Sequence, residues 1–208
     1  MSVREIDMER FRDQIRLLTL KQLHHLGFGH YGGSLSIADV LAVLYGKVMK
    51  IDPANPSWED RDFFILSKGH GGPALYAALH LSGYFEEDVL YTLNQNGTAL
   101  PSHPDRNLTP GVDMTTGSLG QGISAAAGVA LSHKLSGRAN RTFVIVGDGE
   151  LNEGQCWERS NLRRTISSAI FMCLWMIINN SWTARRKRLS IRWILSANLE
   201  PSGFIPKG

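Results

Sequence analysis

The chain has 208 residues, with a hydrophobic share of 43% and a charged share of 20%, which is ordinary for a soluble globular protein with one large core. Its first residues lack the apolar stretch of a secretory signal, and no apolar run approaches the roughly 20 residues that a membrane helix needs. Two cysteines make neither a disulfide framework nor a metal set, so we expect an intracellular, cytoplasmic protein without a membrane partner.

The net charge of +3 hides an uneven distribution. Residues 159–208 carry nine Lys or Arg and one Glu, whereas the residues before them carry 13 basic and 18 acidic side chains. The basic run 185–188 lacks interleaved aromatic residues and any zinc pattern, so we expect a solvated charge run and no nucleic-acid partner. We predict one domain over residues 1–158, followed by a divergent basic segment, 159–208, that completes the same domain or is partly disordered.

Apolar residues at helical spacing predict an amphipathic helix over residues 4–26, which Gly27 ends. A glycine-rich loop to Gly33 follows, and Ser36 is expected to cap a second helix that runs to about Val48. The later elements are expected in this order: strand 63–66, helix 73–81, short helix 86–93, long loop 94–118, helix 123–135, strand 142–146, helix 153–165 and strand 170–178.

The strand at 142–146 stops at Gly147-Asp148-Gly149, and the strand at 170–178 stops at Asn179-Asn180. Ligands of open α/β sheets bind at the carboxyl ends of parallel strands, and Asp and Asn oxygens are ligands that Mg²⁺ or Ca²⁺ prefers. The pattern therefore predicts an α/β fold with an open, mostly parallel sheet flanked by helices. Gly-Asp-Gly by itself is equally compatible with a plain turn.

Three histidines, His30, His70 and His103, lie on loops rich in glycine or proline. They could be zinc ligands, but they lack a tight spacing and accompanying cysteines. Hydrogen bonding to a polyhydroxylated or phosphorylated substrate, with one or two of them moving protons, is the favoured interpretation.

Gly147-Asp148-Gly149 with Asn-Asn some thirty residues later is similar to the thiamine-diphosphate motif. A longer ordered set of segments resembles transketolase, in particular the N-terminal half that some organisms encode as a separate subunit. The resemblance covers about residues 10–158 and is carried by Gly29-His30 with Gly32, Ser67-Lys68-Gly69-His70, Ser102-His103-Pro104, Thr115 to Gly122, and Gly147 to Trp157.

The resemblance implies the thiamine-diphosphate-binding fold, specifically its diphosphate-binding domain. It also implies transfer of a two-carbon ketol unit from a ketose phosphate to an aldose phosphate in pentose phosphate metabolism. The implied roles are as follows: His30, His70 and His103 catalytic; His70, Gly117, Leu119, Gly149 and Asn180 cofactor-binding; Asp148, Asn180 and the carbonyl of Trp182 ligands of Mg²⁺ or Ca²⁺; Glu153 at a subunit contact.

In the family, the glutamate that activates the cofactor lies in a second domain that nothing here matches. The resemblance therefore implies a C-terminal, pyrimidine-binding transketolase subunit as partner in a homo- or hetero-oligomer, such as a dimer.

From Arg159 onward the sequence departs from the family pattern, and the abrupt change of charge favours the hypothesis of a changed reading frame. Two alternatives stay open: a different thiamine-diphosphate enzyme, of the dihydroxyacetone or deoxyxylulose-phosphate synthase type, and an inactive truncated or frameshifted family member.

Overall fold

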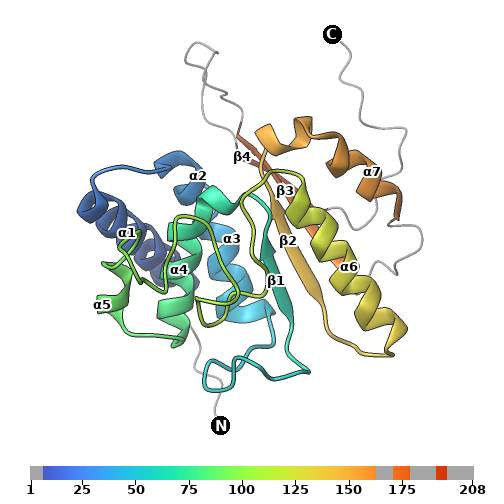
Figure 1. The fold of residues 1–208 in the computed structure, drawn as a ribbon, viewed down its shortest axis with the longest axis horizontal. Coiled ribbons are helices and arrows are strands. Elements are labelled where there is room, and N and C mark those ends of the chain that lie inside the picture. Colours follow the sequence, from blue (N-terminus) through green and yellow to red (C-terminus); the bar gives the residue numbers. More distant parts are fainter. Residues whose placement is uncertain (1–6, 163–170, 179–190, 196–208) are drawn as a thin grey trace.

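The fold is an open four-stranded sheet with helices on both faces (Figure 1). The structure is a computed structural model that describes residues 7–162, 171–178 and 191–195. Its elements are α1 (Met8–Leu26), α2 (Tyr31–Leu35), α3 (Ala38–Val43), a π-helical turn (Leu44–Val48), β1 (Phe63–Leu66), a 3₁₀ turn (Gly69–Gly71), α4 (Gly72–Ser82), α5 (Glu87–Leu90), α6 (Gln121–Leu135), β2 (Thr142–Val146), a second 3₁₀ turn (Gly149–Asn152), α7 (Gly154–Leu162), β3 (Phe171–Ile178) and β4 (Ile191–Leu195).

The strands follow the order β1-β2-β3-β4. β1 and β2 are parallel, with Phe63 beside Thr142, and β2 and β3 are parallel, with Thr142 beside Phe171. β4 is antiparallel to β3 and lies in the basic segment, where the sequence predicted no strand. The expected open, mostly parallel sheet is therefore confirmed.

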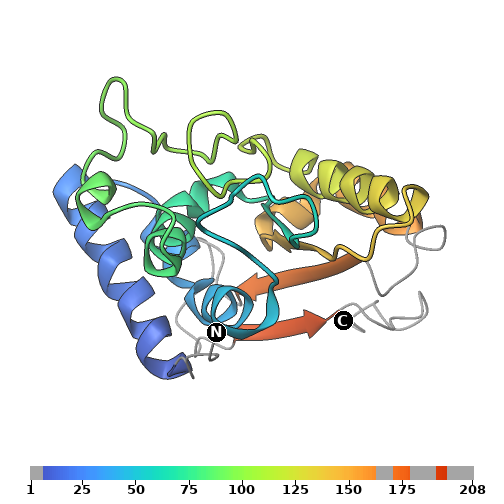
Figure 2. The ribbon, with the colours of Figure 1, turned by 90° about the horizontal axis from the view of Figure 1, so that it is seen from below.

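Alternate residues of the strands supply two separate apolar layers, because successive side chains of a strand point to opposite faces. Phe64 and Ile145 pack in the layer formed with α1, α3 and α4. Ile65 and Val144 pack in the opposite layer, which α6 and Cys156 of α7 cover. Figures 1 and 2 show α1 to α5 on one side of the sheet and α6 and α7 on the other.

Helix α1 begins later than predicted. The Asp7 carboxylate accepts hydrogen bonds from the N–H groups of Glu9 and Arg10, which makes Asp7 the N-cap and Met8 the first helical residue. Gly27, with φ of +85°, ends the helix as predicted.

The region after Gly27 differs from the prediction. Helix α2 forms inside the expected loop, and Ser36 caps no helix N-terminus, because α3 begins at Ala38 after Ile37. The Ser36 hydroxyl instead donates to the carbonyl oxygen of Gly33. The expected second helix thus consists of α3 and a π-helical turn, and α2 is an additional short helix before it.

The remaining expectations hold with small shifts. Strands β1 and β2 have the predicted bounds, Pro73 lies in the first turn of α4, and residues 91–120 form neither helix nor strand. Helix α5 is shorter than expected, and a 3₁₀ turn precedes α7.

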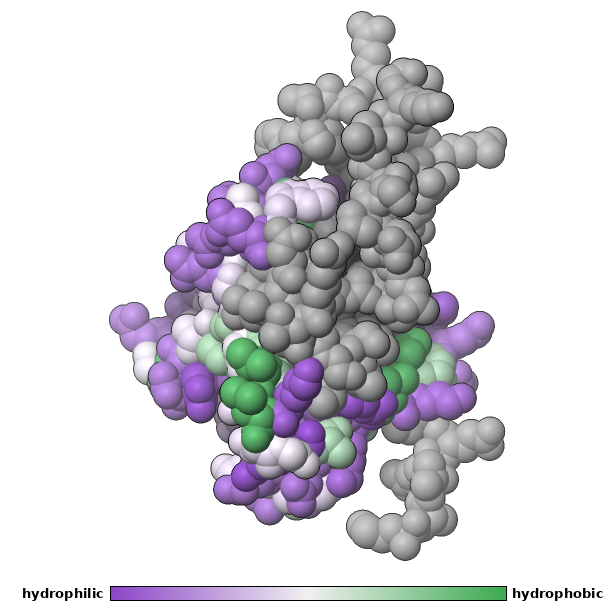
Figure 3. All heavy atoms as spheres, turned by 90° about the vertical axis from the view of Figure 1, so that its right-hand side faces the viewer, coloured by the Kyte–Doolittle hydropathy of each residue, from purple (hydrophilic) through white to green (hydrophobic). Residues whose placement is uncertain are grey.

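The side of the molecule that carries α6 and α7 has a mostly hydrophilic described surface, with apolar groups in separate small areas (Figure 3). Leu135 and Trp157 are large apolar side chains exposed on these two helices. No helix in the described part of the chain combines the length and the apolar character that a membrane span requires.

Candidate functional site

The carboxyl ends of β1 and β2 lie side by side and lead into the two polar segments of the candidate site. β1 is followed by Ser67 to His70, and β2 by Gly147 and Asp148. Thr116, from the long loop, donates its hydroxyl to the carbonyl oxygen of Leu66 at 2.7 Å. Three segments that are far apart in the sequence therefore meet at this edge of the sheet.

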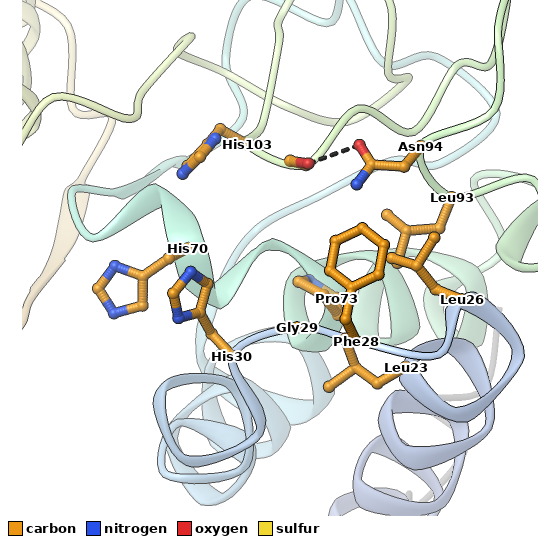
Figure 4. A pocket seen from close by; sticks show the side chains of 11 residues that line it. Leu23, Leu26, Phe28, Gly29, His30, His70, Pro73, Leu93, Asn94 and His103 are labelled. Atoms are coloured by element: carbon orange, nitrogen blue, oxygen red, sulfur yellow. Dashed lines mark hydrogen bonds between the residues drawn. The ribbon is translucent and has the colours of Figure 1, made fainter.

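The three predicted histidines come together here (Figure 4). The ring centroids of His30 and His70 lie 5.1 Å apart. His103 packs against two glycines: a Cβ on Gly69 would lie 3.0 Å from its Cδ2 atom, and one on Gly117 would lie 3.5 Å from its Cγ atom. Glycine is needed at position 69, where the imidazole and the backbone of Gly117 leave too little space for a side chain, whereas the distance at Gly117 is an ordinary van der Waals contact.

These histidines line one end of a pocket whose other end is apolar (Figure 4). Asn94 and Ser102 form part of the wall, where the Ser102 hydroxyl donates to the Asn94 side-chain oxygen at 2.5 Å. The complete lining is Leu23, Leu26, Phe28, Gly29, His30, His70, Pro73, Leu93, Asn94, Ser102 and His103. A polar end beside an apolar wall suits a ligand that carries both hydroxyl groups and a ring.

His70 is neutral at physiological pH in this environment. Its pKa is lowered to about 4, chiefly by burial and then by the neighbouring Lys68, His30 and His103, while Asp148 acts in the opposite direction. A neutral imidazole has one N–H donor and one acceptor nitrogen, so His70 can do both at once.

Lys68 is buried at the end of β1, and the sequence alone gave it no role beyond the motif. Its ammonium group donates to the carbonyl oxygen of Gly33 at 2.6 Å and to the hydroxyl of Ser36 at 3.1 Å. Burial lowers its pKa to about 8, although Asp148 and Glu150 act to raise it. Lys68 thereby joins the His30 segment to the strand that leads into His70.

Asp148 lies at the end of β2 with its carboxylate partly exposed. One of its oxygens accepts from the N–H of Gly149 at 2.9 Å. A Cβ on Gly149 would meet no atom within 4 Å, so the turn faces open space. A carboxylate oxygen beside open backbone is a suitable ligand for a hard divalent cation.

Gly117 and Leu119 lie on the loop that enters α6. Within the described residues, neither backbone N–H donates a hydrogen bond. Free N–H groups just before the N-terminus of a 15-residue helix favour an anion, because the helix dipole adds to them. These residues therefore fit a bound diphosphate whose charge a cation at Asp148 would partly offset.

Glu150 is a second group that sequence reasoning missed. Its side chain is almost fully buried and accepts hydrogen bonds from Ser67 and from the N–H groups of Gly120 and Gly147. A glutamate directly after Gly-Asp-Gly gave no local signal, since two of its three donors, Ser67 and Gly120, come from distant segments.

Three predicted site positions remain to be placed. Glu153 is exposed at the start of α7, next to Gly120, as a contact residue would be. Asn180 and Trp182 lie outside the described residues, so their proposed ligand roles stay predictions. The part of the chain that the structure describes contains no group of three or more His, Cys, Asp or Glu side chains that could by itself hold a metal ion.

The fold and the site define a class of protein: an open-sheet α/β protein that binds its ligand at the carboxyl ends of its parallel strands. The model of the family described as "Transketolase, thiamine diphosphate binding domain" matches residues 8–180. The chain therefore belongs to the transketolase family and contains its thiamine-diphosphate-binding domain. The match continues past Arg159 to Asn180, so the family resemblance does not stop where the basic segment begins.

Individual relatives agree with this assignment. The chain is similar to the 6-deoxy-6-sulfo-D-fructose transketolase subunit SqwG of Clostridium sp. (strain MSTE9), with 58% identity over 158 residues, which are 76% of this chain and 58% of that protein. It is 45% identical to the transketolase of Treponema pallidum (strain Nichols) over 73% of this chain and 25% of that one. Among solved structures, the transketolase from Leishmania mexicana matches with a TM-score of 0.77 and 36% identity, over 82% of this chain and 27% of that one.

The chain thus spans about three fifths of the SqwG relative and about a quarter of the transketolases reported above.

Proposed function

We propose that this chain is the cofactor-binding subunit of a transketolase-type enzyme, which transfers a two-carbon ketol unit from a ketose phosphate to an aldose phosphate. The observation that carries the proposal is the convergence of His30, His70 and His103 at the sheet edge where Asp148 follows β2. The relatives reported above are named as transketolases, so synthases of dihydroxyacetone or deoxyxylulose phosphate are not favoured.

Asp148 would hold a divalent cation, Mg²⁺ or Ca²⁺, together with the predicted ligands Asn180 and the Trp182 carbonyl. The free N–H groups of Gly117 and Leu119 would donate to diphosphate oxygens. The N–H of Gly149, which donates to Asp148 in this structure, would turn to the diphosphate once the carboxylate binds the cation. When bound, thiamine diphosphate supplies the electron sink for cleavage of the donor's C2–C3 bond.

The histidines would act on the sugar. His70, being neutral, would donate one hydrogen bond and accept another without placing a charge beside the cofactor. His30 and His103 would hold sugar hydroxyls from two other segments and move the protons that bond cleavage and bond formation require. The apolar wall near Leu93 and Phe28 would exclude water from the reacting atoms once a partner covers Phe28, which is exposed in this chain.

The active unit would be an oligomer. The SqwG relative is named as a subunit, and Phe28 in the pocket wall is exposed in this chain, which supports a pyrimidine-binding subunit as the partner that covers it. Glu153, exposed beside Gly120, is the proposed contact residue. A dimeric, cytoplasmic enzyme remains the expectation from the sequence.

The test is reconstitution. The chain is mixed with a pyrimidine-binding subunit, such as the companion of the SqwG relative, with thiamine diphosphate and Mg²⁺. Ketol transfer to ribose 5-phosphate is then measured from xylulose 5-phosphate and, because of that relative's name, from 6-deoxy-6-sulfo-D-fructose. Transfer from either donor supports the proposal. Absence of transfer from both, with cofactor bound, would favour the inactive family member.

A further inference from the structure

Glu150 is a buried carboxylate at the centre of the candidate site, and it lines no part of the pocket. It lies in the 3₁₀ turn after β2, with a side chain that is 1% exposed. Its Oε1 atom accepts from the Ser67 hydroxyl at 2.5 Å and from the N–H of Gly120 at 2.8 Å. Its Oε2 atom accepts from the N–H of Gly147 at 3.1 Å. A carboxylate is tolerated in such a place only when several donors meet its charge.

The three donors come from three separate segments: the end of β1, the entry to α6 and the end of β2. Ser67 extends the network, because its hydroxyl oxygen accepts from the N–H of Ile123 in the first turn of α6 at 2.9 Å. A Cβ on Gly122 would lie 2.5 Å from the Ser67 Cα, so the start of α6 lies directly against the end of β1. Glu150 therefore joins all three segments through a single side chain.

Two of these segments carry the groups proposed to bind the diphosphate. Gly120 directly follows Leu119, whose N–H is free within the described residues, and Gly147 directly precedes Asp148. A shift of either glycine would move one set of cofactor-binding groups relative to the other. A displacement of about 1 Å is enough to cost much of an interaction that depends on several aligned groups.

We propose that Glu150 is a positioning residue that sets the spacing between the Gly117–Leu119 loop and the Asp148–Gly149 turn, so that both bind the same diphosphate. This inference rests on the proposed function. Glu150 does not touch the cofactor, and it acts only through the N–H groups that it holds.

The chemistry of the side chain gives a sharp test. Both oxygens of a carboxylate accept hydrogen bonds, whereas a glutamine of the same size has one acceptor and one donor group. In Glu150→Gln, the remaining oxygen can serve Ser67 and Gly120, which leaves the side-chain NH₂ opposed to the N–H of Gly147. Glu158→Gln is the matched control, since it removes the same charge from an exposed position on α7.

The unsubstituted chain, Glu150→Gln and Glu158→Gln are each assembled with the pyrimidine-binding subunit and titrated with thiamine diphosphate in saturating Mg²⁺ by calorimetry. We expect the Kd to rise roughly tenfold for Glu150→Gln, because the two sets of cofactor-binding groups lose their alignment, and to stay within about twofold for Glu158→Gln. Circular dichroism and thermal unfolding of the cofactor-free proteins show whether each variant is folded.

A folded Glu150→Gln with the Kd of the unsubstituted chain, even at a lower Tm, would overturn the inference and leave Glu150 a structural residue. If Glu150→Gln does not fold, the inference is tested with the milder variant Ser67→Ala, by the same titration. It removes one donor to Glu150 and frees the N–H of Ile123, and it should raise the Kd several-fold; an unchanged Kd would overturn the inference. If the unsubstituted assembly binds no cofactor, the proposed function fails and this inference fails with it.

Discussion

The ammonium group of Lys68 lies 2.6 Å from the carbonyl oxygen of Gly33, a residue 35 positions earlier in the chain. A Cβ on Gly33 would lie 2.6 Å from the Cδ2 atom of His70, so the same backbone segment also supports an imidazole of the candidate site. Lys68 thus stabilises the arrangement of the two segments that carry His30 and His70.

The buried lysine predicts a specific pH dependence of stability. Its pKa is lowered from 10.5 to about 8 in the folded chain, so between these values the unfolded chain binds more protons. The free energy of unfolding should therefore rise as the pH increases from about 8 to 10.5, by about 1.4 kcal/mol for each unit of pKa difference.

The variant Lys68→Met should lack this contribution to the pH dependence. Urea unfolding of both proteins at pH 7.5 and 9.5 measures it, with Lys21→Met, at an exposed position on α1, as control. Equal pH dependence of the unsubstituted chain and Lys68→Met would contradict the prediction.

His70 should titrate far below an ordinary histidine. Burial lowers its pKa from 6.5 to about 4, so the unfolded chain binds the proton more tightly, and stability should fall as the pH drops from about 6.5 to 4. Proton NMR of the histidine rings, with His70 assigned by the signal missing in His70→Gln, should give a midpoint near pH 4. A midpoint of about 6 or higher would show that the imidazole is solvated.

Two glycine substitutions of equal size should have opposite results. A Cβ on Gly69 would lie 2.9 Å from the Cα of Gly117, which is backbone and cannot rotate away. Gly69→Ala should therefore cost about 1–3 kcal/mol of stability and weaken cofactor binding, because the loops at the site must separate. Gly128 lies on the exposed face of α6 with nothing within 4 Å, and Gly128→Ala should be neutral or stabilising by up to about 1 kcal/mol. Urea unfolding measures the change in stability of each variant. An unchanged stability of Gly69→Ala would contradict the close contact between Gly69 and Gly117.

The features that were predictable from sequence are those with a local signal. The apolar run 142–146 before Gly147 predicted β2 and its polar end, and histidines on glycine loops predicted the cluster. Helix α2 was not predicted, since two adjacent glycines in Tyr31–Leu35 argue against a helix. It forms where Lys68 bonds to the carbonyl of Gly33, a contact that periodicity does not reveal.

The positioning groups of the site were missed for a related reason. The hydrogen bond of Glu150 to Ser67 joins residues 83 positions apart, and that to Gly120 joins residues 30 apart. Neither Ser67 nor Gly120 shows in the sequence that it binds a distant carboxylate. Only the fold brings them together. Strand β4 was missed for the same reason, because it is recognised only by its pairing with β3.

The central claim is that a divalent cation at Asp148 holds the diphosphate of thiamine diphosphate at the carboxyl edge of β1 and β2. Its most direct test is a calorimetric titration of the assembled enzyme with thiamine diphosphate, with Mg²⁺ and with EDTA, for the unsubstituted chain and for Asp148→Ala. The account predicts binding that requires Mg²⁺ and that is weakened at least tenfold by Asp148→Ala. Equal affinity in the two proteins, or binding that is indifferent to Mg²⁺, would contradict it.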